Sequence, residues 1–166
     1  TVANVACAFD VLGFAVEKPG DEVTISTGKE KGLHIRKIEG DGGRLPLDAA
    51  KNTAAIAATE TLRLIGVTDC SLDISLKKMM PLGSGLGSSA ASAVAAAVAI
   101  NELYGAPLSR EALLPAVLEG ERIACGAAHA DNGAPSLLGG FILIRSYDPL
   151  DTIALSTPPE LYASIV

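Results

Sequence analysis

The chain has 166 residues, of which 49% are hydrophobic, and it carries a formal net charge of −6 with only 13 lysine and arginine residues. This length suits one domain or slightly more, and the apolar share is ample for a buried core. The acidic balance, the absence of tryptophan and the lack of a basic run argue against a nucleic-acid partner, and no apolar run approaches the roughly 20 residues of a membrane span.

The N-terminal third reads as strands and turns. We expect a strand, a loop and a second strand within residues 2–16, and a turn at residues 19–21. Residues 22–27 and 33–38 alternate apolar and polar side chains, which predicts a β-hairpin. The glycine-rich residues 40–43 predict a flexible loop.

Helices dominate the middle of the sequence. The pattern predicts a helix over residues 52–65 that ends at Gly66, and then a strand over Leu72, Ile74 and Leu76. A second helix is expected over residues 90–104, and one face of it is predicted to hold Ala93, Ala96, Ala97, Ile100, Leu103 and Tyr104.

The last part of the chain predicts a third helix and a further strand. The helix covers residues 109–124 and is expected to kink or restart at Pro115. The strand covers residues 137–144, with a bend at Gly139 and Gly140. Strands occur both in hairpins and between helices, so we expect an α+β fold with a mixed sheet covered by helices.

The segment of residues 81–92 reads Pro-Leu-Gly-Ser-Gly-Leu-Gly-Ser-Ser-Ala-Ala-Ser and leads into the second helix. Glycines feeding a helix N-terminus leave free N–H groups and a positive dipole end, which suit a phosphate. The dinucleotide spacing fails at Ser88, and the G-x-x-x-x-G-K-[ST] loop fails because the turn has no lysine. We predict a different phosphate loop, whose serine hydroxyls are free to help bind Mg²⁺; the alternative is an ordinary turn capped by Ser88 or Ser89.

Other polar residues have a structural and a functional interpretation. Asn4 and Asp10 either form Asx turns or contact a small polar substrate. Glu121 either faces solvent or completes a Mg²⁺ shell. The segment of residues 129–132, His-Ala-Asp-Asn, is either a polar turn with an N-capping aspartate or a group of substrate contacts.

The three cysteines are scattered and have no C-x-x-C spacing. They predict reduced thiols in a cytoplasmic protein, without a disulfide framework or a zinc site. Cys125 is a weak nucleophile candidate beside His129, which leaves a thiol hydrolase conceivable.

Three segments together resemble the GHMP small-molecule kinases. The phosphate-loop segment is similar to the central motif of that superfamily. Asn-Val-Ala-Cys-Ala-Phe-Asp-Val-Leu-Gly-Phe at residues 4–14 and His-Ala-Asp-Asn-Gly-Ala-Pro-Ser-Leu-Leu-Gly-Gly-Phe at residues 129–141 resemble its homoserine kinase branch. The resemblance implies an N-terminal ATP-binding domain over residues 1–155 with a left-handed β-α-β crossover at the phosphate loop. Residues 156–166 would begin a C-terminal domain, in which we expect the basic residues that hold the substrate carboxylate.

The resemblance also implies an activity, which is transfer of the ATP γ-phosphoryl group to the hydroxyl of L-homoserine, on the route to threonine. Asn4, Asp10 and His129 would hold homoserine, and Ser89 and Glu121 would hold Mg²⁺. Asn132 falls where several sister kinases place a catalytic aspartate. The ATP-binding residues would be Asn52, Thr53, Pro81, Leu82, Gly83, Ser84, Gly85, Leu86, Gly87, Ser88 and Ser89.

Two further readings stay open beside this one. One is another kinase of the superfamily that acts on a sugar or an isoprenoid alcohol, and the other is a non-catalytic nucleotide-binding relative. The expected partner is a small alcohol, with neither nucleic acid nor membrane, and a homodimer is left open.

Overall fold

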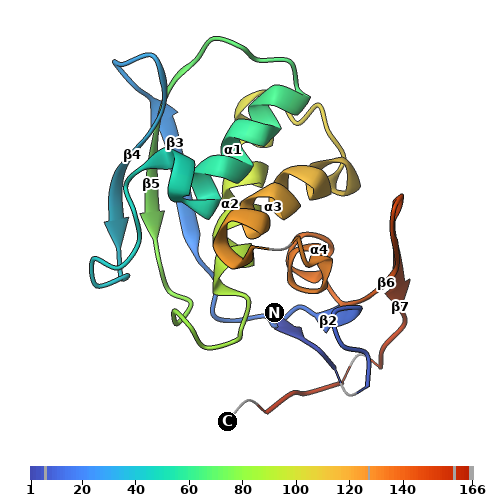
Figure 1. The fold of residues 1–166 in the computed structure, drawn as a ribbon. Helices are drawn as coiled ribbons and strands as arrows, with labels where there is room; N and C mark the ends of the chain where they lie inside the picture. The colour runs from blue at the N-terminus through green and yellow to red at the C-terminus, as the bar shows by residue number, and fades with distance from the viewer. Residues whose placement is uncertain (6, 127, 159, 165–166) are drawn as a thin grey trace.

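The computed structural model describes residues 1–5, 7–126, 128–158 and 160–164 of the chain. It has two sheets with the helices lying between them (Figure 1). One sheet has the strand order β3 (Glu22–Thr27), β5 (Ser71–Lys77) and β4 (Gly32–Glu39). The other has the order β1 (Val2–Ala3), β2 (Leu12–Phe14), β6 (Phe141–Tyr147) and β7 (Leu150–Leu155). The helices are η1 (Ala49–Lys51), α1 (Thr53–Leu64), α2 (Ser88–Leu103), α3 (Arg110–Cys125) and α4 (Ala130–Leu138). The predicted α+β class is confirmed.

The predicted hairpin between β3 and β4 is wrong, although both strands exist. β5 lies between them, antiparallel to β3 and parallel to β4. The turn after β3 sets this arrangement, because the N–H groups of Gly28 and Gly32 donate to the carbonyls of Ser71 and Cys70, each at 2.7 Å. The turn therefore forms hydrogen bonds with the start of β5, and β3 and β4 do not pair with each other.

The pair β4 and β5 supplies a β-α-β unit. The two strands are parallel neighbours, and the chain between them forms η1 and α1. The segment of residues 81–92, which contains the predicted phosphate loop, is the next part of the chain after β5. The crossover that the resemblance implies is thus present, and its left hand stays a prediction.

Helix α2 packs into two hydrophobic clusters. Ala93 and Ala97 belong to a cluster with α3, α4 and β6, whereas Ala96 and Ile100 belong to a cluster with α1 and the three-stranded sheet. These four side chains are fully buried, but they divide between two clusters instead of lying together on the one predicted face. Small side chains allow this close approach on two sides. Leu103 and Tyr104 were predicted on the same face, but they lie at the end of α2 and are 48% and 39% exposed.

Local signals place most helix ends as expected. The Asn52 side chain accepts a hydrogen bond from the N–H of Ala54 at 3.0 Å and caps α1. The Ser109 hydroxyl accepts one from Ala112 at 3.3 Å and caps α3. Helix α3 runs through Pro115 without restarting.

Helix α4 corrects two expectations. The strand predicted for residues 137–144 begins only at Phe141, because Leu137 belongs to this helix. The polar turn at residues 129–132 is the start of the helix, and its N-cap is His129 rather than Asp131. Gly133 and Pro135 weaken the helical signal in the sequence. Close packing against α3 stabilises the helix instead. A Cβ on Gly133 would lie only 3.1 Å from the Val117 side chain of α3, so the glycine allows this close contact.

Two further segments differ from expectation. The loop at residues 40–43 is organised by Asp41, whose buried carboxylate accepts hydrogen bonds from Gly43 and Leu45. The sequence pattern at residues 163–166 also predicts a strand, but residues 163 and 164 lie in no strand, and residues 165 and 166 fall outside the described residues. The domain division at residue 155 stays a prediction. Within the described ranges, no helix is both long and apolar enough to cross a bilayer.

Candidate active site

A cavity of about 530 Å³ opens between the phosphate-loop segment, α1 and α3. It brings together most of the predicted nucleotide-binding residues, although Pro81 and Leu86 do not line it. Lys78, Ser92, Glu121 and Asn132 also contribute to its wall, as do Leu45, Pro46 and Lys51. The predicted members in the lining are Asn52, Thr53, Leu82, Gly83, Ser84, Gly85, Gly87, Ser88 and Ser89.

The glycine loop, defined here as residues 81–87, owes its shape to three glycines in the left-handed region. Gly83, Gly85 and Gly87 have φ values of 73°, 74° and 66°. Gly87 is the N-cap of α2, and no side chain caps that end of the helix. The alternative of an ordinary turn capped by Ser88 or Ser89 is therefore wrong, and the first turn of α2 keeps N–H groups for a ligand.

Gly87 also brings two helices together. A Cβ on this residue would lie 2.1 Å from the Thr1 hydroxyl and 2.6 Å from the carboxamide oxygen of Asn132. No larger residue fits without movement of its neighbours. The start of α2 thus contacts the first turn of α4, and Asn132 reaches the cavity beside the glycine loop.

Ser89 and Glu121, the two predicted metal ligands, meet in the structure. The Ser89 hydroxyl donates to Glu121 Oε2 at 3.1 Å, which joins α2 to α3. Glu121 is only 5% exposed, and its Oε1 has no hydrogen-bond partner. Burial raises the pKa of the Glu121 carboxyl to about 7, against the opposing effect of the Ser89 hydrogen bond. A buried carboxylate oxygen without a partner fits a cation.

This donor set suits Mg²⁺ better than a fully protein-bound metal. Within the described residues, no group of three or more histidine, cysteine, aspartate or glutamate side chains gathers at one point. Mg²⁺ usually takes one or two protein oxygens and completes its shell with phosphate and water. Ser89 and Glu121 fit that requirement.

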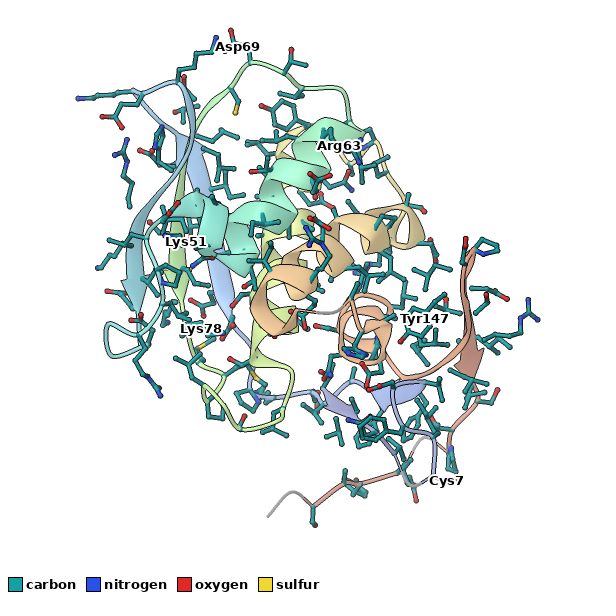
Figure 2. All side chains as sticks on the ribbon, in the orientation of Figure 1. Cys7, Lys51, Arg63, Asp69, Lys78 and Tyr147 are labelled. Carbon is teal, nitrogen blue, oxygen red and sulfur yellow. The ribbon has the colours of Figure 1, made fainter. Side chains whose placement is uncertain are left out.

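The predicted substrate residues Asp10 and His129 also lie together. His129 Nδ1 is 3.5 Å from Asp10 Oδ1, and both side chains are partly exposed. The Tyr147 hydroxyl donates to the Asp10 carbonyl at 2.7 Å and accepts from the N–H of Ala130 at 3.2 Å. Figure 2 shows Tyr147 beside α4. This tyrosine, which gave no signal in the sequence, fixes the Asp10 loop to the start of α4.

Asn4 and Asn52 each form hydrogen bonds to the backbone that hold parts of the site in place. Asn4 Oδ1 accepts from the N–H of Asp10 at 2.8 Å. This bond spans six residues and holds the loop closed, so it is not the Asx turn of the structural interpretation. The Asn52 amide donates to the Pro46 carbonyl at 3.0 Å while its oxygen caps α1. Asn52 therefore braces the cavity wall at Pro46.

Sequence reasoning missed three charged residues. Asp131 is 1% exposed, its Oδ1 has no partner, and burial together with the nearby Asp10 raises its pKa. Lys78 and Asp21 form a buried ion pair beside the loop. The strand alternation contained the signal, because Lys78 continues the inward series of Leu72, Ile74 and Leu76. Asp21 continues the series of Val23 and Ile25 in the same way.

Cys125 cannot be placed in this arrangement, since its side chain lies outside the described residues. The thiol hydrolase hypothesis therefore gains no support. The site that the structure assembles consists of hydroxyls, amides, carboxylates, the imidazole of His129, the ammonium of Lys78 and backbone N–H groups.

Known proteins share both the sequence and the fold. Residues 50–140 match the family described as GHMP kinases N terminal domain. The homoserine kinase of Chloroherpeton thalassium is 55% identical over all of this chain and 55% of its own length. That of Arabidopsis thaliana is 45% identical over 96% of this chain and 44% of its own length.

Solved structures agree with these relatives. The crystal structure of homoserine kinase from Cytophaga hutchinsonii has a TM-score of 0.90 and 57% identity, over 95% of this chain and 50% of that one. Mevalonate kinase of L. major is 22% identical with a TM-score of 0.62, over 81% of this chain and 42% of that one, and shows a shared fold. The chain spans about half the length of the curated relatives it matches. The family match, these relatives and the glycine loop at the start of α2 agree, and the chain belongs to the GHMP kinases, within their N-terminal domain.

Proposed function

We propose that the protein containing this chain phosphorylates L-homoserine on its side-chain hydroxyl, with ATP as donor, in threonine biosynthesis. The observation that carries the proposal is the contact between Ser89 and Glu121, with an unpartnered Glu121 oxygen at the glycine loop. A nucleotide-binding relative without catalysis has no need of such a carboxylate. The names of the similar proteins support homoserine as the acceptor.

The nucleotide would bind with its phosphates against the glycine loop. The free N–H groups of the first turn of α2 would receive the phosphate oxygens. Thr53, Leu45 and Pro46 line the other part of the cavity, where the base would lie. Ser89 and Glu121 would hold Mg²⁺, which when bound neutralises charge on the transferring phosphoryl group.

The acceptor would lie beside Asp10, His129 and Asn132. The Asp10 carboxylate is a suitable partner for the ammonium group of homoserine. Asn4 and His129 would add hydrogen bonds, and the buried Asp131 would contribute negative charge behind them.

Asn132 would orient the attacking hydroxyl rather than remove its proton. A carboxamide is not a general base, because its oxygen is scarcely basic and its nitrogen carries only donors. Phosphoryl transfer proceeds largely by positioning and charge stabilisation. The oxygen of homoserine would attack the γ-phosphorus, the bond to the ADP oxygen would break, and the hydroxyl proton would pass to the phosphate.

The experiment is ATP turnover by the intact protein with Mg²⁺ and a panel of homoserine, threonine, mevalonate and galactose. We expect ADP release that depends on homoserine. Release with mevalonate or galactose alone would favour another kinase of this family, and ATP binding without turnover would favour a nucleotide sensor. The cytoplasmic location also stays a prediction, and the possibility of a homodimer stays open.

A further inference from the structure

A buried ion pair lies beneath the glycine loop. The side chains of Asp21 and Lys78 are 0% and 1% exposed, and the lysine ammonium donates to the aspartate carboxylate. Figure 2 shows Lys78 where β5 meets the loop. The same ammonium donates to the Ser88 carbonyl and to the Ser92 hydroxyl, each at 2.8 Å. A lysine has three N–H donors, so all of them are used within the protein.

Asp21 makes the complementary contacts. One carboxylate oxygen accepts from the N–H groups of Met79 at 3.0 Å and Met80 at 2.9 Å. The other accepts from the Ser92 hydroxyl at 2.7 Å, besides the lysine. Asp21 therefore holds the chain just before the glycine loop begins.

The pair thus secures both ends of the glycine loop. Asp21 binds the residues that precede position 81, and Lys78 binds Ser88 and Ser92, which follow position 87. Ser92 contacts both charges and joins the two ends. The distance between the two ends of the loop is therefore fixed, and the residues between them can change conformation only within that limit.

Stability of the sheet does not explain such a pair. Burying two ions carries a desolvation penalty that often exceeds their attraction. Accordingly, burial lowers the pKa of Lys78, although Asp21 and Glu121 oppose this effect. On the same two strands, Glu22 and Lys77 form an ion pair at 3.2 Å with largely exposed side chains. A surface pair therefore already links β3 to β5.

We propose that Asp21, Lys78 and Ser92 are positioning residues that hold the glycine loop in its phosphate-binding shape, and that Lys78 donates nothing to the phosphates. This inference rests on the proposed function, in which the loop receives ATP. It distinguishes two roles for a lysine that lines the cavity. If Lys78 were a phosphate ligand, removing the Asp21 charge would release its ammonium and strengthen ATP binding.

The test uses the intact protein and three variants. Ser92→Ala keeps both charges and removes the bridge. Asp21→Asn/Lys78→Met removes both charges together and leaves no isolated ion. Glu22→Gln/Lys77→Met is the matched control on the same strands. Calorimetry gives the Kd for ATP with Mg²⁺, steady-state kinetics gives the KM for homoserine, and hydrogen exchange follows the amides of residues 82–87.

We expect each of the first two variants to raise the Kd for ATP about tenfold, because hydrogen bonds to charged groups are lost. Exchange at residues 82–87 should accelerate by about the same factor. The KM for homoserine should stay within about twofold, and the control should match wild type in every measurement. A general loss of structure would instead accelerate exchange in α1 and α3 as well.

Unchanged ATP affinity and unchanged loop exchange in a folded Ser92→Ala protein would overturn the inference. So would tighter ATP binding by a single Asp21→Asn variant. If the double variant does not fold, the ATP affinity and loop exchange of the Ser92→Ala variant alone test the inference. If wild type binds no ATP, the proposed function fails, whereas loop exchange still decides whether these residues position the loop.

Discussion

The Thr1 hydroxyl donates a 2.7 Å hydrogen bond to the carboxamide oxygen of Asn132. Thr1 is 7% exposed and directly precedes β1, and Asn132 lies in the first turn of α4. The bond engages the oxygen of the carboxamide and leaves its nitrogen, a donor, as the group that can meet an acceptor alcohol. Thr1 therefore decides which atom of Asn132 an acceptor alcohol would meet.

This relationship predicts that Thr1→Val lowers kcat about fivefold in the intact protein, because a hydrogen bond contributes about 1 kcal/mol. Thr1→Ser keeps the hydroxyl and is expected to retain wild-type turnover. Steady-state kinetics with homoserine would check both. Equal kcat values for the valine and serine variants would show that the hydroxyl has no orienting role.

A substitution of Asn132 itself should lower turnover more than a substitution of Thr1. We expect Asn132→Ala to lower kcat by about 100-fold, since misplacing a reacting group by about 1 Å has effects of that size. The Kd for ATP should change little, because the glycine loop is intact. Unchanged turnover in the alanine variant would rule out the orienting role.

Glu121 predicts a dependence of stability on pH in the protein without metal. Its pKa is raised from 4.5 to about 7 in the folded state, so the folded state binds the extra proton between these values. Stability from this group therefore falls as pH rises from about 4.5 through 7, by on the order of 3 kcal/mol. Glu121→Gln should raise Tm at pH 8 and leave it nearly unchanged at pH 4. Calorimetric melting at both pH values is the measurement, and equal effects at the two values would contradict the assignment.

The same carboxyl predicts how Mg²⁺ binding depends on pH. A cation requires the ionised form, so affinity for Mg²⁺ with ATP should rise as pH passes through about 7. Glu121→Gln should abolish this rise, whereas Ser89→Ala should weaken binding and keep the rise. Titration calorimetry from pH 6 to pH 8 separates the two variants. A glutamine variant with the wild-type profile would remove Glu121 from the metal site.

Gly87 offers a test of close packing at the site. Gly87→Ala places a Cβ within 2.6 Å of both Thr1 and Asn132 at a φ of 66°. Gly66→Ala is the matched control, with a φ of 80° and no atom within 4 Å of its Cβ. The control should lose about 1 kcal/mol of unfolding free energy through backbone strain alone. Gly87→Ala should lose more and also lower kcat, as urea unfolding and kinetics would show. Equal losses in stability and equal kcat would mean that the neighbours of Gly87 move aside easily.

Local chemistry explains which elements were predictable. The cap at Asn52, the cap at Ser109 and the glycines before α2 act within a few residues, so the sequence marks these helix ends. Ser89 and Glu121 were paired through the family resemblance, and the structure confirms that they touch. Their binding of a metal stays a prediction.

The incorrect predictions concern features that depend on contacts between segments far apart in the sequence. The partner of β3 depends on β5, which lies more than 40 residues away in the chain. Helix α4 contains Gly133 and Pro135 and forms because it packs on α3 and β2. The roles of Asp21 and Lys78 required knowledge of which loop ends they join, which alternation alone does not provide.

The alanines of α2 have a consequence for how this protein tolerates change. Ala93 packs on one cluster and Ala96 on the other, and Ala93 also lies close to Gly120 of α3. A methyl group added at either of these buried alanines must therefore be matched by a smaller residue on the side that it enters. Variants at these alanines should survive mainly as compensated pairs, whereas the exposed end of the outer strand β7, at Ala154 and Leu155, should accept single replacements.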